Sequence, residues 1–255
     1  KRRYSMTLNP TLEGLRSLKL FGMVKALEAQ IETPGADKLS FEERLGMLVD
    51  HELTSRNNKR LSNRLKQAKL RFPACIEDLD LNTRRGLNRS EIVQLSTCSW
   101  IQKHQNIIVE GKTGVGKSYL SCAFAEKACR EGFSTIYFRT SRLFEEIAVS
   151  KVEGRFHKFL DRLVKVNLLV LDDFGIVPFA PEHSRDLFEI VEDRYDRQST
   201  IISGQLPVEN WHEAIGDDTI ADAILDRLVH NAYRIKLKGP SKRTEMGKED
   251  QNNNE

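Results

Sequence analysis

The chain has 255 residues, of which 39% are hydrophobic and 30% charged, and its formal net charge is +3. This length is enough for one α/β domain with a smaller attachment. No apolar run approaches the roughly 20 residues of a membrane span, and no secretory signal pattern is visible, so we expect a cytoplasmic protein without a membrane partner.

The N-terminal region is predicted to be helical. Residues 1–5 precede Met6 and are either a native basic arm or an addition to the natural chain. Helically spaced apolar residues predict one helix that ends at Thr33–Gly35. These residues are Leu20, Val24, Leu27 and Ile31. Ser40 and Glu43 have the spacing of a capping box, so a second helix is expected to begin there.

The second predicted helix carries a run of basic residues that we expect to end at Pro73. No acidic residue lies between Glu52 and Glu77, so repulsion among the cations is not relieved within the segment. A solvated helix face is one interpretation, but we favour contacts to nucleic-acid phosphates, whose neutralisation releases counterions. No base-reading motif is visible, which predicts largely sequence-independent binding. The candidate DNA contacts here are Arg56, Lys59, Arg60, Arg64, Lys66 and Lys69.

The central motif is a phosphate loop between a predicted strand and a predicted helix. The pattern G-x-x-x-x-G-K-[ST] follows the apolar run 107–109 and precedes the helix-compatible segment 119–131. Its glycines let N–H groups approach phosphate oxygens, Lys117 is expected to reach the β and γ phosphates, and the Ser118 hydroxyl can bind Mg²⁺. A chance glycine-rich turn is the alternative. The predicted nucleotide contacts are Gly111, Lys112, Thr113, Gly114, Val115, Gly116, Lys117, Ser118 and Tyr119.

These motifs predict four segments. They are a helical basic domain for DNA binding and assembly at 1–75, a linker at 76–98, a nucleotide-binding domain at 99–240, and a polar, disordered tail at 241–255. Residues 90–102 are expected to form a short helix that leads into the nucleotide-binding domain.

The four cysteines are Cys75, Cys98, Cys122 and Cys129. They form no C-x-x-C pair and have no histidine at zinc-ligand spacing. Cys122 and Cys129 share one face of the predicted helix after the phosphate loop. We expect all four to be reduced structural thiols.

Residues 167–173 combine an apolar strand with two terminal carboxylates, Asp172 and Asp173. A buried parallel strand delivers such acids to the phosphate end of a sheet. Asp172 is expected to hold Mg²⁺ through its water shell, and Asp173 to polarise or orient the attacking water. Aspartates that only cap a strand-to-loop turn are the alternative.

Other elements extend this domain along the chain. They are a strand at 135–138, helices at about 141–149 and 154–165, a strand at 199–205 and a helix at 220–230. Gln205 is expected near the γ-phosphate or the water, with Ser203 as second choice. Arg227 is either a functional cation or the partner of Asp226 in a surface ion pair.

The chain resembles the AAA+ ATPases of the initiator and helicase-loader group. The motifs are the phosphate loop, Leu-Leu-Val-Leu-Asp172-Asp173-Phe-Gly, Ile-Ile-Ser-Gly-Gln205-Leu-Pro and Asp-Arg227-Leu. The segments Glu52–Pro73 and Lys238–Arg243 are similar, more closely, to the IstB family, whose members assist the transposases of bacterial insertion sequences. The resemblance covers about residues 8–243.

This resemblance implies an α/β fold, with an AAA+ P-loop NTPase core around a five-stranded parallel sheet and a small helical domain before it. It implies ATP and Mg²⁺ as ligands, a homo-oligomer formed with ATP on double-stranded DNA, and assistance to a cognate transposase. Arg227 is implied to be an arginine finger that acts on the ATP of a neighbouring subunit. The implied DNA-tracking residues of the two inserted helices are Arg142, Lys151, Arg155 and Lys158.

Three features depart from the family pattern. Many AAA+ proteins have Glu at the position of Asp173, and Asn at that of Gln205. Few residues follow Gly239, so we expect no C-terminal helical lid. A site that is open on one side makes completion by a neighbour's Arg227, together with Lys242 or Arg243, more necessary.

Three other functions share parts of these motifs. A DnaC-type replicative helicase loader has the same chemistry, but it serves a hexameric helicase on single-stranded DNA, so a preference for duplex DNA separates the two. A small-molecule kinase needs an acceptor pocket and a lid, for which the sequence offers no segment. A non-hydrolysing ATP-dependent scaffold is disfavoured by the intact Asp172-Asp173 pair.

Overall fold

A computed structural model of the chain describes residues 5–81 and 86–241. The chain divides into two compact units, residues 1–63 and 64–255. The predicted N-terminal arm, except Ser5, lies outside the described residues. So does the predicted tail, except Ser241, and with it Lys242 and Arg243. Within the described ranges, no helix is both long and apolar enough to cross a lipid bilayer.

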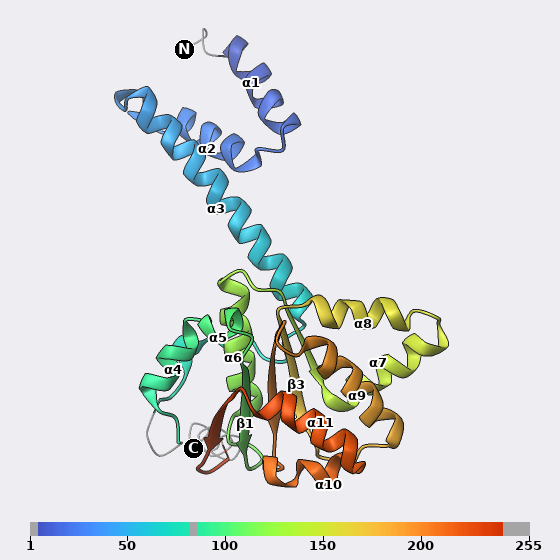
Figure 1. The fold of residues 1–255 in the computed structure, drawn as a ribbon. Helices are drawn as coiled ribbons and strands as arrows, with labels where there is room; N and C mark the ends of the chain where they lie inside the picture. Colours follow the sequence, from blue (N-terminus) through green and yellow to red (C-terminus); the bar gives the residue numbers. More distant parts are fainter. Residues whose placement is uncertain (1–4, 82–85, 242–255) are drawn as a thin grey trace, which may run out of the picture. The chain divides into compact units, whose positions relative to one another are not determined.

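The first unit contains helices α1 (Ser5–Ser17) and α2 (Phe21–Glu32), the short 3₁₀ helix η1 (Ala36–Lys38) and most of α3 (Phe41–Ala68) (Figure 1). The prediction of a single helix before Thr33 is wrong. The chain leaves the helical path at Lys19, which has a left-handed φ of 60°. No glycine or proline lies at Lys19 to mark the break, and the helical spacing of the apolar residues continues on both sides of it. The sequence therefore gives no sign of two separate helices.

Two polar contacts organise the first unit. The capping box is confirmed, because the Glu43 N–H donates to the Ser40 hydroxyl (3.2 Å) and the Ser40 N–H donates to the Glu43 carboxylate (2.8 Å). Glu52, a buried residue of α3, accepts hydrogen bonds from the N–H groups of Gly22 (2.6 Å) and Met23 (3.1 Å). A carboxylate at a helix N-terminus balances the positive end of the helix dipole, so Glu52 fixes the start of α2 against α3.

The helix α3 ends earlier than predicted. Its last residue is Ala68, and Lys69 follows with a left-handed φ of 52°. The prediction that Pro73 ends this helix is therefore wrong. The residues from Arg64 onward belong to the second unit.

The second unit is a five-stranded, wholly parallel sheet flanked by helices, as predicted. In chain order its elements are η2 (Ile76–Asp78), α4 (Arg89–Ser96), α5 (Ser99–Gln102), β1 (Asn106–Gly111), α6 (Lys117–Arg130), β2 (Thr135–Arg139), α7 (Thr140–Val152), α8 (Phe156–Lys165), β3 (Leu168–Phe174), α9 (Pro181–Arg194), β4 (Ser199–Gly204), η4 (Val208–Asn210), α10 (Trp211–Ile215), α11 (Asp218–Val229) and β5 (Ala232–Leu237). The strand order is β2-β3-β4-β1-β5.

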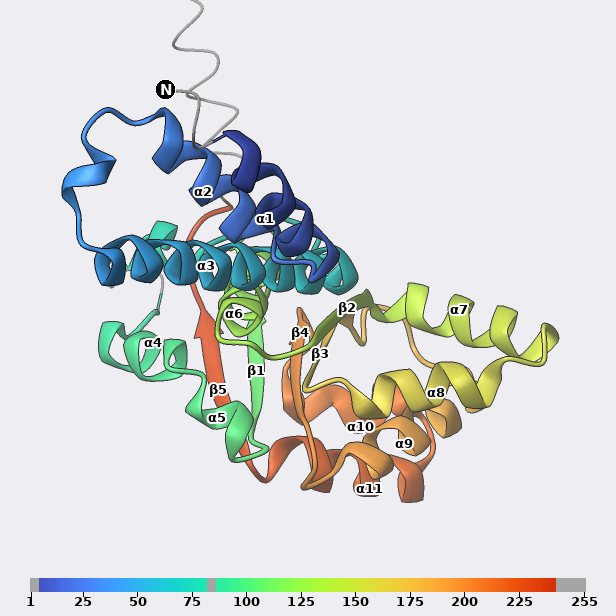
Figure 2. The ribbon, with the colours of Figure 1, turned by 90° about the horizontal axis from the view of Figure 1, so that it is seen from above.

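The helices α4 and α5 lie on one side of the sheet, and α9 to α11 lie on the other (Figure 2). Alternate residues of the strands face two separate apolar clusters. In β3, Leu168 and Val170 face the cluster formed with α4, α5 and α6, whereas Leu169 and Leu171 face the one formed with α7 to α11. A fully buried aliphatic side chain contributes about 1.5–3 kcal/mol, so burial on both faces stabilises the sheet. Ile92 and the other buried residues of α4 lie in the first cluster, so part of the segment expected to be a linker is core of this unit.

The four cysteines are free thiols. Cys98, Cys122 and Cys129 are buried, and burial raises the pKa of the Cys98 thiol to about 11. Burial likewise raises the pKa of Cys122 and Cys129. These thiols are therefore protonated and unreactive at neutral pH, as expected for structural residues.

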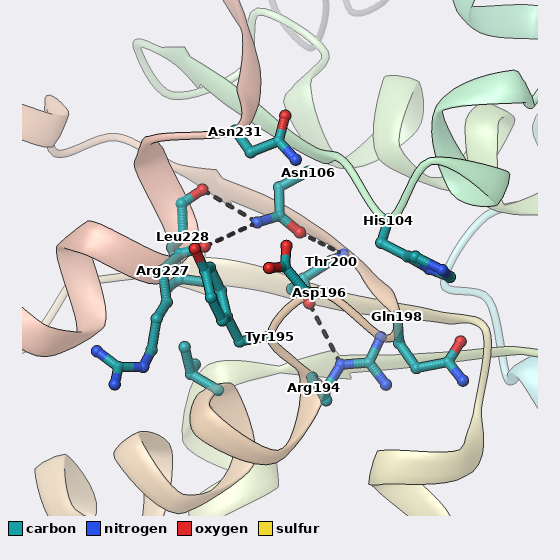
Figure 3. Close-up of a pocket in the computed structure, with 11 residues that line it drawn as sticks. His104, Asn106, Arg194, Tyr195, Asp196, Gln198, Thr200, Arg227, Leu228 and Asn231 are labelled. Carbon is teal, nitrogen blue, oxygen red and sulfur yellow. Dashed lines mark hydrogen bonds between the residues drawn. The ribbon is translucent and has the colours of Figure 1, made fainter.

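Asn106, the first residue of β1, connects the amino ends of β1 and β4 (Figure 3). Its buried side-chain amide donates to the carbonyl oxygens of Arg227 and Leu228 (3.2 Å each) and accepts from the N–H of Thr200 (2.9 Å). Asn106 thus joins β1, β4 and the end of α11. Next to it, the buried Arg194 guanidinium donates to carbonyl oxygens that include that of Val166 (2.9 Å), and burial lowers the pKa of Arg194 to about 9.

The substitution Asn106→Ala is expected to lower the free energy of unfolding by about 1–3 kcal/mol, because it leaves buried backbone groups unpaired. Urea denaturation measures this loss. Gln105→Ala is the matched control, since Gln105 is only half-buried and its amide donates to the Asn231 side chain at 3.2 Å. Equal losses in the two variants would contradict a special role for Asn106.

Candidate nucleotide-binding site

The loop between β1 and α6 has the backbone of a phosphate cradle. Gly114 and Gly116 have left-handed φ values of 82° and 104°, which residues with a Cβ rarely adopt. Gly116 is the N-cap of α6 and makes no side-chain cap hydrogen bond. The first N–H groups of a helix in this situation form an anion-binding site.

A cavity of about 710 Å³ opens beside this loop, within the usual range for small-ligand sites. The predicted contacts that line it are Thr113, Gly114, Gly116, Lys117, Ser118 and Tyr119. The buried Lys117 ammonium group donates to the carbonyl oxygen of Lys112 (2.9 Å). Val115, in contrast, is buried in the first apolar cluster, where it supports the loop rather than a ligand.

Gln205, which follows β4, also lines the cavity. The Thr113 hydroxyl donates to its side-chain oxygen at 2.6 Å, so the structure brings Gln205 to the phosphate loop. Ser203, the second choice from the sequence, instead donates its hydroxyl to Asp172.

Asp172 and Asp173 close β3 in two different environments. Asp172 is fully buried, and one of its oxygens accepts from the Tyr137 hydroxyl at 2.6 Å. Asp173 has a left-handed φ of 59°, at the point where the register between β3 and β4 shifts, and it lines the cavity. Burial, together with the charge of Asp172, raises the pKa of Asp173, while nearby cations oppose the shift.

The oxygen atoms at this edge of the sheet fit Mg²⁺, which prefers hydroxyl, carboxylate and water oxygens. Ser118 and Asp173 line one cavity, and Asp172 adjoins Asp173. Both oxygens of Asp172 already accept hydrogen bonds, from Tyr137 and Ser203, which suits contact through a water shell. Across the described ranges, no group of three or more His, Cys, Asp and Glu residues is arranged to hold a metal ion.

Arg227 is not brought into the cavity of its own chain. It lies near the end of α11 (Figure 3). Its guanidinium donates to the Ala223 carbonyl oxygen (2.9 Å) and pairs with Glu192. The ring of Phe188 is 5.5 Å away. The ion partner is therefore Glu192 rather than the Asp226 considered from the sequence, and Asn106 holds the Arg227 backbone at the amino end of β1.

The predicted DNA-contacting residues differ in how firmly they are held. Lys59, Arg60, Lys66, Lys69 and Lys158 are exposed. The others have partners within the chain. These pairs are Arg56–Glu52, Arg64 with the Cys129 carbonyl oxygen, Arg142–Glu145, Lys151–Asp186 and Arg155–Glu153. Repulsion along α3 is thus partly relieved inside the protein.

Three residues of the cavity were not predicted as site residues: Arg71, Phe72 and Asp78. Arg71 Nη1 lies 3.6 Å from Asp172 and 3.5 Å from Asp173, and the Phe72 and Tyr119 rings are 6.5 Å apart. In the sequence Arg71 is only the last cation of a basic run, a hundred positions from its partners, and no motif marks it.

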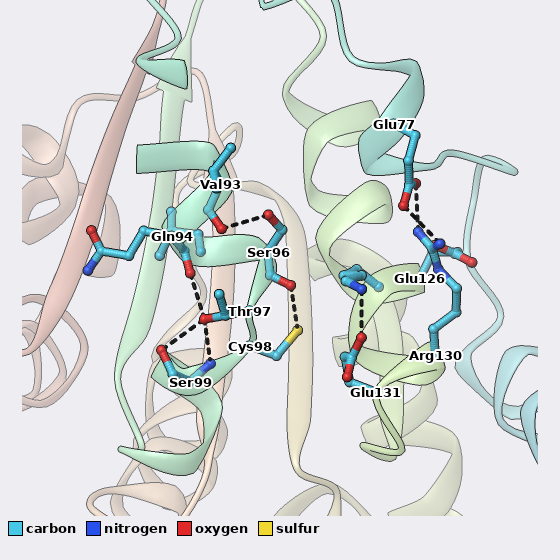
Figure 4. A network of polar contacts seen from close by, with 12 residues as sticks. Glu77, Val93, Gln94, Ser96, Thr97, Cys98, Ser99, Glu126, Arg130 and Glu131 are labelled. Atoms are coloured by element: carbon cyan, nitrogen blue, oxygen red, sulfur yellow. Dashed lines mark hydrogen bonds and ion pairs between the residues drawn. The ribbon is translucent and has the colours of Figure 1, made fainter. Parts of the chain in front are cut away.

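The segment that carries these residues is anchored to α6. Arg130 donates to both carboxylate oxygens of Glu77 (2.9 and 2.7 Å) and also pairs with Glu126 (Figure 4). The hydrogen bonds from Arg130 lower the pKa of Glu77 to about 2. Ala74 is fully buried in the first apolar cluster, so this wall of the cavity is part of the folded domain.

Replacing Tyr137 with Phe tests the support of Asp172. Burial and the hydrogen bond to Asp172 raise the pKa of Tyr137, so the hydroxyl remains a donor. We expect Tyr137→Phe to lower the free energy of unfolding by about 1.5–3 kcal/mol, the usual contribution of a hydrogen bond to a charged group. Tyr233→Phe is the control, because that hydroxyl donates only to Gln105 at 3.4 Å. Urea denaturation that gives the same loss for both would refute the assignment.

Comparison with known proteins adds independent findings. A family model described as IstB-like ATP binding protein matches residues 13–250. The chain is 47% identical, over 238 residues, to an insertion sequence ATP-binding protein of Sinorhizobium fredii, y4pL, and the alignment covers 93% of this chain and 97% of that protein.

Solved structures show a similar fold. DnaI has a TM-score of 0.56 and 22% identity, over 65% of this chain and 92% of its own. The DnaC helicase loader has a TM-score of 0.50 and 20% identity, over 64% of this chain and 98% of its own. The phosphate loop, the parallel sheet and the family match agree, and the chain belongs to the family of IstB-like ATP-binding proteins.

Proposed function

We propose that this protein is an Mg²⁺-dependent ATPase that assembles on double-stranded DNA and assists a transposase in target selection. The observation that carries the proposal is that the predicted site residues lie in two separate places in the subunit. The phosphate loop, Asp173 and Gln205 share one cavity, whereas Arg227 lies at the other end of β1. We therefore propose that the Arg227 of a second copy completes the site, which Arg227 of the same subunit does not reach.

The cavity residues have distinct roles in the proposed hydrolysis. Lys117 balances charge on the β and γ phosphates, and Gln205, held by Thr113, orients the attacking water. The raised pKa of Asp173 makes its carboxylate a better acceptor for the proton of that water. Ser118, and Asp172 through water, would hold Mg²⁺, which would neutralise part of the phosphate charge.

Assembly follows from where Arg227 lies. An arginine that approaches the γ-phosphate from a neighbouring subunit stabilises the charge of the transition state. In the single chain the guanidinium rests on Glu192 beside the Phe188 ring, and we propose that it leaves them to reach the neighbour's nucleotide. ATP then joins adjacent copies.

The DNA and transposase parts of the proposal rest on α3 and on the relatives. The exposed cations Lys59, Arg60 and Lys66 suit phosphate contacts, and a relative that covers nearly the whole chain is named for an insertion sequence. A helicase loader remains the second candidate because the DnaC structure shares the fold. Preference for duplex over single-stranded DNA favours the first function.

A mixing experiment tests the shared site. Lys117→Ala is expected to lose ATP binding, and Arg227→Ala to keep it while hydrolysis falls by about 10³-fold, the usual effect of an arginine finger. Mixing the two inactive variants with ATP and DNA should restore part of the turnover, because the intact Arg227 of one meets the intact loop of the other.

Arg234→Ala is the matched control for loss of one cation. Arg234 lies on β5, 3.8 Å from Glu209, and its removal should leave turnover near the wild-type rate. Wild-type turnover by Arg227→Ala alone, or an inactive mixture whose members still assemble, contradicts the shared site.

DNA binding is tested by neutralising Lys59, Arg60 and Lys66 with Gln. Arg64 is left intact because its guanidinium donates to the Cys129 carbonyl oxygen at 2.8 Å. The plot of log affinity against log salt for a duplex should lose up to about 3 units of slope, since each phosphate contact contributes about 0.9.

A second triple variant removes the same charge from residues of the first unit that lie outside α3. It replaces the exposed Lys19, Lys25 and Lys38 with Gln, and its salt slope should equal that of the wild type. If both triple variants change duplex affinity equally, the cations of α3 make no specific contribution.

A further inference from the structure

The guanidinium of Arg71 lies against both carboxylates that close β3. Its Nη1 is 3.5 Å from an oxygen of Asp173 and 3.6 Å from one of Asp172. These are ion-pair distances rather than short hydrogen bonds, so one cation is shared by two anions. The side chain is one-third exposed and lines the same cavity as Lys117.

The surroundings of Arg71 favour its charged form. The Phe72 ring lies 5.2 Å from the guanidinium carbon, a distance typical of a cation–π contact. Burial lowers the pKa of Arg71, but the Tyr137 hydroxyl and the two aspartates raise it by more. Arg71 is therefore a fixed positive charge within the candidate nucleotide site.

The charges at this edge of the sheet limit what can bind there. Asp172 and Asp173 together carry two negative charges when ionised, and Arg71 offsets one of them. A divalent cation beside the same carboxylates would lie close to the guanidinium, and like charges at short range repel strongly in a partly buried site. Arg71 and a metal ion are thus alternative partners of the pair.

Resting on the ATPase function proposed above, we propose that Arg71 is an internal counter-cation of Asp172 and Asp173 that Mg²⁺ must displace when it enters with the nucleotide. The displaced guanidinium still has a partner, because the cavity that it lines takes the triphosphate, and arginine binds phosphate oxygens well. Arg71 also follows closely after α3, which ends at Ala68.

Thermal unfolding of the nucleotide-free full chain tests this exchange with Mg²⁺ as the only ligand. In EDTA, Arg71→Gln should unfold at a lower temperature than the wild type, because Asp172 and Asp173 lose the cation that pairs with both of them. Adding Mg²⁺ should raise the Tm of Arg71→Gln by about 2–4 °C more than that of the wild type. Lys69→Gln removes the same charge from an exposed position nearby and should respond to Mg²⁺ as the wild type does.

A double variant locates the response. Adding Asp173→Asn to Arg71→Gln removes one of the two anions, so the extra Mg²⁺ stabilisation should disappear. An extra stabilisation that persists in the double variant, or an equal response of Arg71→Gln and the wild type, overturns the proposal.

Nucleotide binding gives a second readout that is separate from turnover. With a fluorescent, non-hydrolysable ATP analogue, the free Mg²⁺ concentration for half-maximal binding should fall several-fold in Arg71→Gln. An unchanged or higher Mg²⁺ requirement refutes displacement. If the wild type binds no nucleotide at all, the proposed ATPase function fails, whereas the thermal response to Mg²⁺ alone still decides the role of Arg71.

Discussion

The carboxyl ends of β1, β3 and β4 meet at one edge of the parallel sheet, and the candidate site depends on this pairing. Glu110 of β1 pairs with Gly204 of β4, and Phe174 of β3 pairs with the same glycine. Residues far apart in sequence, such as Thr113 and Gln205, come within hydrogen-bonding distance as a result. The candidate site therefore depends on the order of the strands in the sheet as well as on the sequence of the phosphate loop.

The sequence predicted those parts of the site that a local pattern encodes. The phosphate loop and the acids at the end of β3 follow apolar runs typical of buried strands, and both occur where expected. β5 was not recognised as a strand because it is a partly exposed edge strand without such a run. Arg71 was missed because its partners are brought to it only by tertiary folding.

Charge patterning was a weaker guide than apolar patterning. The sequence favours contacts to nucleic-acid phosphates for the basic run before Pro73, but the structure gives its residues different surroundings. Arg56 is engaged by Glu52, Arg64 supports the end of α6 through Cys129, and Arg71 enters the nucleotide cavity. A run of like charges therefore contains residues with different roles, and only burial and partners separate them.

Through Asn106, β1 connects the phosphate loop to the backbone of Arg227. One end of this strand leads into the phosphate loop, and the other, through Asn106, grips the backbone of Arg227. In an assembly of the proposed kind, each β1 would act as a rigid strut between two successive ATP sites. A rotation of β1 caused by nucleotide binding or release at one site would then move Arg227 at the next site. Such coupling favours sequential over random hydrolysis of ATP among the subunits.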